Sequence, residues 1–148
     1  MRCLIIAALT LLGGCASLGG SPSDLLELQR GAATAYAEGD YAQASRSYRQ
    51  VAEALPNDAD MRYRLGNSLA KQGEVDAAIQ AYREAVVRDS GHAKAWHNLI
   101  YLQLQGVGHT VAEMYLHIDR HDPRIAPVAT KAEAVMQAFE VPLERQEP

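Results

Sequence analysis

The sequence predicts an all-α fold made of repeated helix hairpins, and two observations lead to this prediction. The first is a pair of helical patterns on either side of Gly73, in which apolar residues recur at helical spacing. A glycine at this place can adopt the left-handed conformation that ends a helix, so an antiparallel helix pair with a tight turn is expected. The second observation is a fixed interval, because Gly39 precedes Gly73 by 34 residues. Tyr48 precedes Tyr82 by the same 34 residues.

The repeated pattern resembles the tetratricopeptide repeat, whose period is also about 34 residues. The small, glycine and aromatic positions carry the resemblance: Leu65, Gly66, Gly73, Ala78, Tyr82 and Ala85. It implies a right-handed α-solenoid of about three helix hairpins, at about 25–58, 59–92 and 93–123, within a domain at 24–141. One hairpin cannot bury its apolar face alone, so the hairpins are expected to stack and to be closed by a capping helix at about 127–140.

The N-terminus has the features of a secretion signal. Residues 3–12 form a mostly apolar run that is too short to span a bilayer. The run ends in Leu12-Gly13-Gly14-Cys15, which resembles the lipobox of bacterial lipoprotein signal peptides. The resemblance implies that residues 1–14 are removed, that Cys15 carries acyl chains such as palmitate, and that these chains hold the protein at a membrane. The alternative is a plain secretory signal that contains a cysteine by chance.

The residues after the cysteine bear on location. Ala16 and Ser17 follow Cys15, and no aspartate stands next to it. By resemblance to the usual sorting rule, this favours the periplasmic face of the outer membrane of the bacterial cell envelope. Residues 15–23 are expected to form a flexible tether between the lipid and the folded domain.

Capping signals predict where the helices of the first two repeats begin. Asp24, with Glu27 three residues later, predicts the start of the first helix. Asp40 is expected to cap the second helix, and Asn57 or Asp58 the third.

The third repeat departs from the pattern, because Ile100 stands where the second repeat has a glycine. Gly106 and Gly108 predict a turn at 106–109, followed by a new helix at 111–121. The last helix is expected to close the open edge of the core, and residues 142–148 to form a flexible tail.

The first helix of each hairpin is expected to line a concave groove. The resemblance assigns groove positions to these residues: Gln29, Tyr36, Asp60, Tyr63, Asn67, Lys71, Lys94, His97, Tyr101 and Gln105. Phenol rings, amides and cations suit the binding of a protein or peptide partner, although an ordinary solvated helix face is the alternative. A carboxylate clamp like that of some family members is not expected, because Tyr63 and Gln29 replace its lysine.

Metal and catalytic sites are not predicted. Glu113, His117 and His121 lie four residues apart in the predicted helix and could share a metal, but an exposed pair and a histidine at a helix end are the simpler interpretation. No nucleophile stands in a catalytic arrangement and no phosphate-binding loop is present, so neither enzyme activity nor a cofactor is expected.

Composition narrows the possible functions. The net charge of −4 gives no basic surface for nucleic acid, and the only cysteines, Cys3 and Cys15, cannot form a disulfide framework in the repeats. The leading hypothesis is a membrane-anchored scaffold or assembly factor of a pilus, secretin or other envelope machine. The alternative is an accessory subunit that docks a cell-wall enzyme, and a third hypothesis is metal binding through the two histidines. The oligomeric state stays open.

Overall fold

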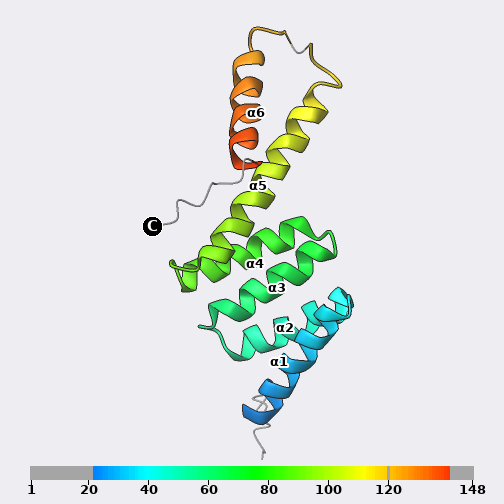
Figure 1. Cartoon of the computed structure of the whole chain (residues 1–148), viewed down its shortest axis with the longest axis vertical. Helices are drawn as coiled ribbons and strands as arrows, with labels where there is room; N and C mark the ends of the chain where they lie inside the picture. Colours follow the sequence, from blue (N-terminus) through cyan, green and yellow to red (C-terminus); the bar gives the residue numbers. More distant parts are fainter. Residues whose placement is uncertain (1–21, 120, 141–148) are drawn as a thin grey trace, which may run out of the picture.

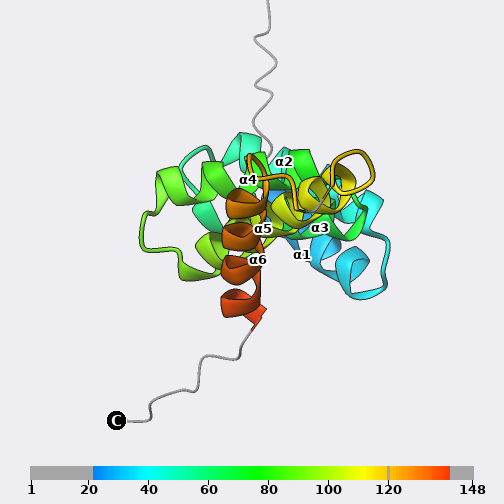
Figure 2. The ribbon, with the colours of Figure 1, turned by 90° about the horizontal axis from the view of Figure 1, so that it is seen from above.

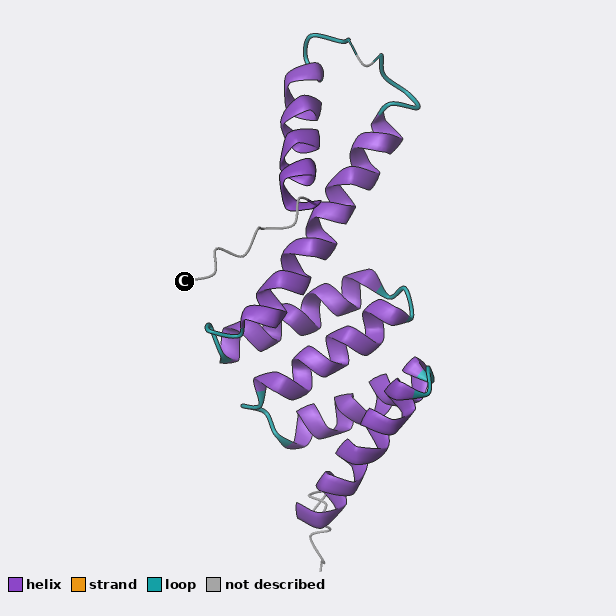
Figure 3. Cartoon of the chain, viewed as in Figure 1, coloured by secondary structure: helices purple, strands orange, loops and turns teal. Residues whose placement is uncertain are grey.

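The computed structural model describes residues 22–119 and 121–140, and all regular secondary structure in these residues is helical. The helices are α1 (Pro22–Ala37), α2 (Tyr41–Ala54), α3 (Ala59–Lys71), α4 (Val75–Arg88), α5 (Ala93–Met114) and α6 (Ala126–Glu140). They stack in chain order along the long axis of the molecule, from α1 at one end to α5 and α6 at the other (Figures 1 and 3). The predicted all-α solenoid of helix hairpins is therefore confirmed.

Parts of the sequence prediction lie outside the described residues. These are the signal peptide at 1–14, the acylated Cys15 and the tail at 142–148. The first described helix begins at Pro22, two residues before the predicted Asp24, so the last residues of the proposed tether are helical. Proline is favoured in the first turn of a helix, where its missing N–H leaves no hydrogen bond unmade. None of the described helices is long and apolar enough to cross a membrane.

Two glycines and two aspartates define the first two hairpins. Gly39 and Gly73 end α1 and α3 with φ of 85° and 79°, the left-handed conformation expected of them. Asp40 accepts a hydrogen bond from the N–H of Gln43 at 2.9 Å and caps α2. Asp58 accepts one from Met61 at 3.0 Å and caps α3 in the same way.

The core is continuous along the stack. One cluster lies between α1, α2 and α3 and contains Tyr48 and Val51, both fully or almost fully buried. A second cluster lies between α3, α4 and α5 and contains Tyr82 and Leu99. Leu65 packs against both clusters, so the repeats share one core as stacked hairpins require.

Gly66 allows α3 and α4 to pack closely. A Cβ atom at this position would lie 2.6 Å from Cε1 and 2.7 Å from Cδ1 of the Tyr82 ring. The ring therefore occupies the space that a side chain at Gly66 would need, and it is only 2% exposed. The small residue of the repeat pattern thus positions the aromatic residue of the same repeat.

Arg62 joins the first two repeats. Its side chain is buried, its Nη1 donates to the carbonyl oxygen of Ala52 at 3.0 Å, and its Nε donates to Glu84 at 2.9 Å. Ala52 lies near the end of α2, where backbone carbonyls lack helical partners. The Arg62 guanidinium therefore hydrogen-bonds a backbone carbonyl at the end of the first hairpin. It is held in place by Glu84 of α4, the second helix of the second hairpin.

The third repeat is not the predicted hairpin. α5 is one helix of 22 residues that passes through the expected turn at 106–109, so the separate helix predicted at 111–121 is wrong. Gly106 and Gly108 lack the positive φ of Gly39 and Gly73. The Thr110 hydroxyl donates to the carbonyl of Gly106, one turn earlier in the same helix, at 2.9 Å. A glycine permits a left-handed turn without imposing one, and here the helix continues.

The last helix occupies the expected position in the sequence but packs differently from the expectation. α6 runs antiparallel to α5 and packs chiefly against it, beyond the stacked hairpins (Figures 1 and 2). Its Phe139 ring lies against His97 and Tyr101 of α5, with centroid distances of 5.8 Å and 6.2 Å. Phe139 of α6 therefore covers His97, one of the α5 residues predicted to face the groove.

Candidate functional site: a groove between the first helices

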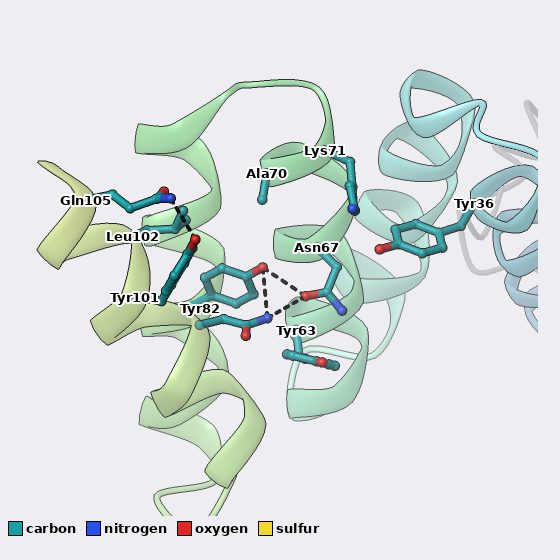
Figure 4. A pocket seen from close by; sticks show the side chains of 10 residues that line it. Tyr36, Tyr63, Asn67, Ala70, Lys71, Tyr82, Tyr101, Leu102 and Gln105 are labelled. Carbon is teal, nitrogen blue, oxygen red and sulfur yellow. Dashed lines mark hydrogen bonds between the residues drawn. The ribbon is translucent and has the colours of Figure 1, made fainter. Parts of the chain in front are cut away.

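A groove of about 470 Å³ lies where α3 and α5 face each other. Ten residues line it: Tyr36, Tyr63, Asn67, Ala70, Lys71, Tyr82, Asn98, Tyr101, Leu102 and Gln105. All but Tyr36 and Tyr82 come from α3 and α5, so the groove follows the first helices of successive repeats. Figure 4 shows Tyr36 and Lys71 on one side of the groove and Tyr101 and Gln105 on the other.

A hydrogen-bond network forms the centre of the groove wall. The Tyr82 hydroxyl donates to Oδ1 of Asn67 at 2.8 Å. Nδ2 of Asn98 donates to the same Asn67 oxygen at 3.0 Å and to the Tyr82 hydroxyl at 3.3 Å (Figure 4). The network joins α3, α4 and α5, and it fixes the orientation of both amides.

Burial raises the pKa of Tyr82 to about 12, and the nearby phenols of Tyr63 and Tyr36 add to the shift while the hydrogen bond with Asn98 opposes it. Burial also raises the pKa of Tyr36. Tyr82 is therefore neutral at physiological pH and can act as the donor in the network. This phenol is a structural part of the wall, with no base beside it that would prepare it for catalysis.

The α3 side of the groove offers hydrogen-bond donors from Asn67 and Lys71 to a ligand. Because Oδ1 of Asn67 accepts two hydrogen bonds, the Nδ2 hydrogens of that amide are available to a ligand. Lys71 lies one turn further along α3, and it is the one charged side chain among the described residues that line the groove. Donors and a cation suit the carbonyl groups of an extended backbone and a carboxylate.

Six of the ten predicted groove residues line this groove: Tyr36, Tyr63, Asn67, Lys71, Tyr101 and Gln105. The other four lie elsewhere. Gln29 is half-buried on α1, and Lys94 is exposed at the start of α5.

The remaining two predicted groove residues contact other side chains. Asp60 accepts from Arg64 at 3.0 Å and lies 3.5 Å from Nε2 of His92. His97 packs against Phe139 of α6. Both groups are therefore engaged within the protein and do not line the groove.

Four further residues line the groove: Ala70, Tyr82, Asn98 and Leu102. Ala70 and Asn98 occupy groove offsets of the repeat, whereas Tyr82 and Leu102 are not assigned to the groove by the sequence. The Tyr82 ring lies in the core. Its hydroxyl reaches the groove only because Gly66 lets the ring lie against α3, and the sequence signal for this is the pairing of that glycine with an aromatic residue 16 positions later.

The predicted arrangement of Glu113, His117 and His121 does not form. α5 ends at Met114, so these residues do not share one helix, and His117 and His121 lie exposed after it. Within residues 22–119 and 121–140, no group of three or more histidine, cysteine, aspartate or glutamate side chains is placed to hold a metal.

Comparisons with known proteins agree with the repeat pattern. A sequence profile described as Tetratricopeptide repeat matches residues 30–93. The TPR repeat-containing protein BH2049 of Halalkalibacterium halodurans is 41% identical over 46 residues, which make up 31% of this chain and 21% of that protein. The chain thus matches about a fifth of the length of that relative.

A solved structure shares the fold. It is the Yersinia enterocolitica type III secretion chaperone SycD in complex with a peptide of the translocator YopD, with a TM-score of 0.58 and 20% sequence identity. The match covers 80% of this chain and 94% of that chain.

Proposed function

We propose that this tetratricopeptide-repeat protein is a scaffold that binds an extended segment of a partner protein in the groove between α3 and α5. The groove itself is the observation that carries the proposal, because it combines tyrosine rings, a fixed amide donor and one cation in a continuous concave surface. An extended peptide offers carbonyl groups along its whole length, and these can accept from Asn67 and Lys71. The complex of SycD with a translocator peptide supports this choice, because that protein has the same fold.

The charge of the groove favours an acidic segment. The chain as a whole carries a net charge of −4, which disfavours an acidic partner at long range. Among the described residues that line the groove, none is acidic and Lys71 is the single cation. A carboxylate of the partner is therefore stabilised at Lys71 in spite of the net negative charge of the chain.

We further infer that the scaffold is held at the periplasmic face of the outer membrane through Cys15, as an assembly factor for a pilus, secretin or other envelope machine. The support is the lipobox-like segment at 12–15, which is separated from the start of α1 at Pro22 by only six residues. An anchor at this distance raises the local concentration of any captured partner near the membrane.

The groove is tested by a pull-down from crosslinked cell envelopes with three forms of the protein. Ala70→Glu places bulk and negative charge in the groove without removing a side-chain hydrogen bond, whereas Gln80→Glu makes the same charge change on the exposed surface of α4. The wild type and Gln80→Glu are expected to capture the same partner, and Ala70→Glu is expected to lose it while keeping its helical circular dichroism. Capture by all three forms, or by none, would contradict the proposal.

The anchor is tested separately by Cys15→Ser. This variant is expected to lose metabolic labelling with palmitate and to leave the membrane fraction, while its groove still binds the partner in solution. Palmitate labelling that persists in Cys15→Ser would refute the anchor and leave the groove proposal standing.

A further inference from the structure

We propose that α6 supplies a specificity subsite at one end of the groove, a notch that takes one aliphatic side chain of the bound peptide. The notch lies between α5 and α6 and has a volume of about 70 Å³. Its lining residues are Tyr101, Leu104, Gln105, Met136 and Phe139. The inference rests on the proposed function, because the occupant is part of the same peptide that fills the groove.

The notch is continuous with the groove. Tyr101 and Gln105 line both spaces, and Nε2 of Gln105 donates to the Tyr101 hydroxyl at 2.9 Å. These two side chains thus form a shared boundary whose polar groups already bind each other. A peptide that leaves the groove on the α5 side therefore meets the notch next.

The notch is apolar beyond that boundary. Leu104, Met136 and Phe139 supply the rest of its lining, and none of them offers a strong hydrogen-bonding group. Water in such a space has too few polar partners to be held well, so an apolar group that displaces it gains affinity. The chemistry of the lining therefore selects an apolar side chain.

The size of the notch favours an aliphatic side chain over an aromatic one. An apolar cavity of about 150 Å³ is large enough for benzene. The notch has about half that volume, at about 70 Å³. Valine, leucine, isoleucine and methionine are the side chains that fit this space best.

Three contacts hold α6 at the position that forms the notch. The Phe139 ring packs against Tyr101, and in the middle of α6 Glu133 accepts from the Tyr115 hydroxyl at 3.2 Å. Between them, Gly108 leaves room for Met136, since a Cβ there would lie 2.6 Å from the Met136 Cε. The glycine that does not form a turn thus has a packing role, and it brings one wall of the notch against α5.

Lys71 sets the register of the peptide. Lys71 lies on α3, across the groove from Tyr101, which borders the notch (Figure 4). Both Lys71 and the notch have fixed positions in the fold, so one extended chain that meets both has a fixed spacing between its acidic and its aliphatic residue. The favoured ligand therefore carries an acidic residue and an aliphatic residue at one constant separation.

The test begins with a phage-displayed library of random 12-residue peptides selected on the purified mature chain. Selected peptides are expected to share an aliphatic residue at a constant spacing from Asp or Glu, and Lys71→Met is expected to lose the acidic preference alone. Failure to select any peptide would overturn the proposed function. Peptides selected without a fixed aliphatic position would overturn the subsite and leave the groove in place.

A double-mutant cycle then places the aliphatic residue in the notch. Replacing it by alanine in a selected peptide is expected to weaken binding to wild type by about 10- to 100-fold, as expected for burial of an aliphatic side chain. On Phe139→Ala the same peptide change is expected to cost less than about threefold, and on Val135→Ala, an exposed position of α6, the full effect is expected to remain. An equal loss on all three proteins would overturn the assignment.

A measurement without a destabilising substitution covers the case in which Phe139→Ala releases α6. Wild-type protein labelled with ¹³C at the methionine methyl groups is titrated with the selected peptide, and the Met136 signal is assigned with Met136→Leu. The Met136 methyl is expected to shift and to show nuclear Overhauser contacts to the aliphatic methyl groups of the peptide. Peptide contacts that exclude Met136 would refute the subsite.

Discussion

The substitution Gly66→Ala tests the packing that positions the groove wall. The new Cβ would lie 2.6 Å from Cε1 and 3.1 Å from Cζ of Tyr82, so the ring has to move. The ring is fixed at its far end by the 2.8 Å hydrogen bond to Asn67, and only 2% of the residue is exposed. It cannot move without disturbing either the core or the network.

The expected magnitude follows from three terms. Overpacking of a well-filled core costs about 1–3 kcal/mol. Loss or distortion of the tyrosine hydrogen bond adds about 0.5–1.5 kcal/mol. Against these, alanine is favoured over glycine inside a helix by about 0.5–1 kcal/mol. The net expectation is that Gly66→Ala lowers the free energy of unfolding by about 1–3 kcal/mol.

The matched control is Gly31→Ala on α1, where no atom lies within 4 Å of the added Cβ. It makes the same chemical change inside a helix, and it is expected to raise the free energy of unfolding by about 0.5–1 kcal/mol. Urea unfolding followed by circular dichroism at 222 nm compares both variants with wild type. If Gly66→Ala were as stable as Gly31→Ala, the close packing of Tyr82 on α3 would be refuted.

Three further predictions concern the network, the repeat junction and α5. The pKa of Tyr82 is raised to about 12 in the folded chain, whereas an unfolded tyrosine titrates near 10. The stability that the neutral Tyr82 phenol contributes is therefore complete below about pH 10 and is lost as the pH rises towards 12. Tyr82→Phe is expected to flatten this fall in the free energy of unfolding between about pH 10 and 12. A slope unchanged in the variant would show that other groups cause it. Arg62→Met removes a buried hydrogen-bond donor from the end of α2 and is expected to lower the free energy of unfolding by about 2 kcal/mol in the same urea assay. Arg64→Met breaks only an exposed ion pair and is expected to lower it by less than about 0.5 kcal/mol. Equal costs would refute the structural role of the buried guanidinium. Gly106→Ala is expected to stabilise the folded chain by about 0.5–1 kcal/mol, because α5 is continuous at this residue. Gly73→Ala is expected to destabilise it by about 1 kcal/mol or more, because Gly73 has a φ of 79°. Destabilisation by both substitutions would indicate a turn at Gly106.

The first two hairpins could be predicted from the sequence because each of their signals acts locally. Gly39 and Gly73 take the left-handed conformation at the ends of helices, and Asp40 and Asp58 cap the helices that follow. Each signal depends on residues within one turn, so no tertiary information was needed. The 34-residue interval then shows that these local units are equivalent.

The third repeat could not be predicted in the same way because its outcome depends on a distant contact. Gly106 and Gly108 are compatible with a turn and with a continuous helix, and the close approach of Met136 from α6 to Gly108 is a contact that the local sequence does not reveal. The same limit applies to the groove. The offsets of the repeat indicate which helix faces line it, but they do not show that Phe139 covers His97 or that the Tyr82 hydroxyl emerges between α3 and α5.

The position of α6 also affects how the chain unfolds. In a stack where each helix packs chiefly on its neighbours, the end elements open with the least free energy, and α6 has only α5 as a principal partner. Local detachment of α6 would remove the notch while α1 to α4 keep their fold. The apparent affinity for a peptide that uses the notch is then its intrinsic affinity multiplied by the fraction of molecules with α6 docked. Mild warming or low denaturant should therefore abolish aliphatic selectivity first, and general peptide binding only when the repeats themselves unfold.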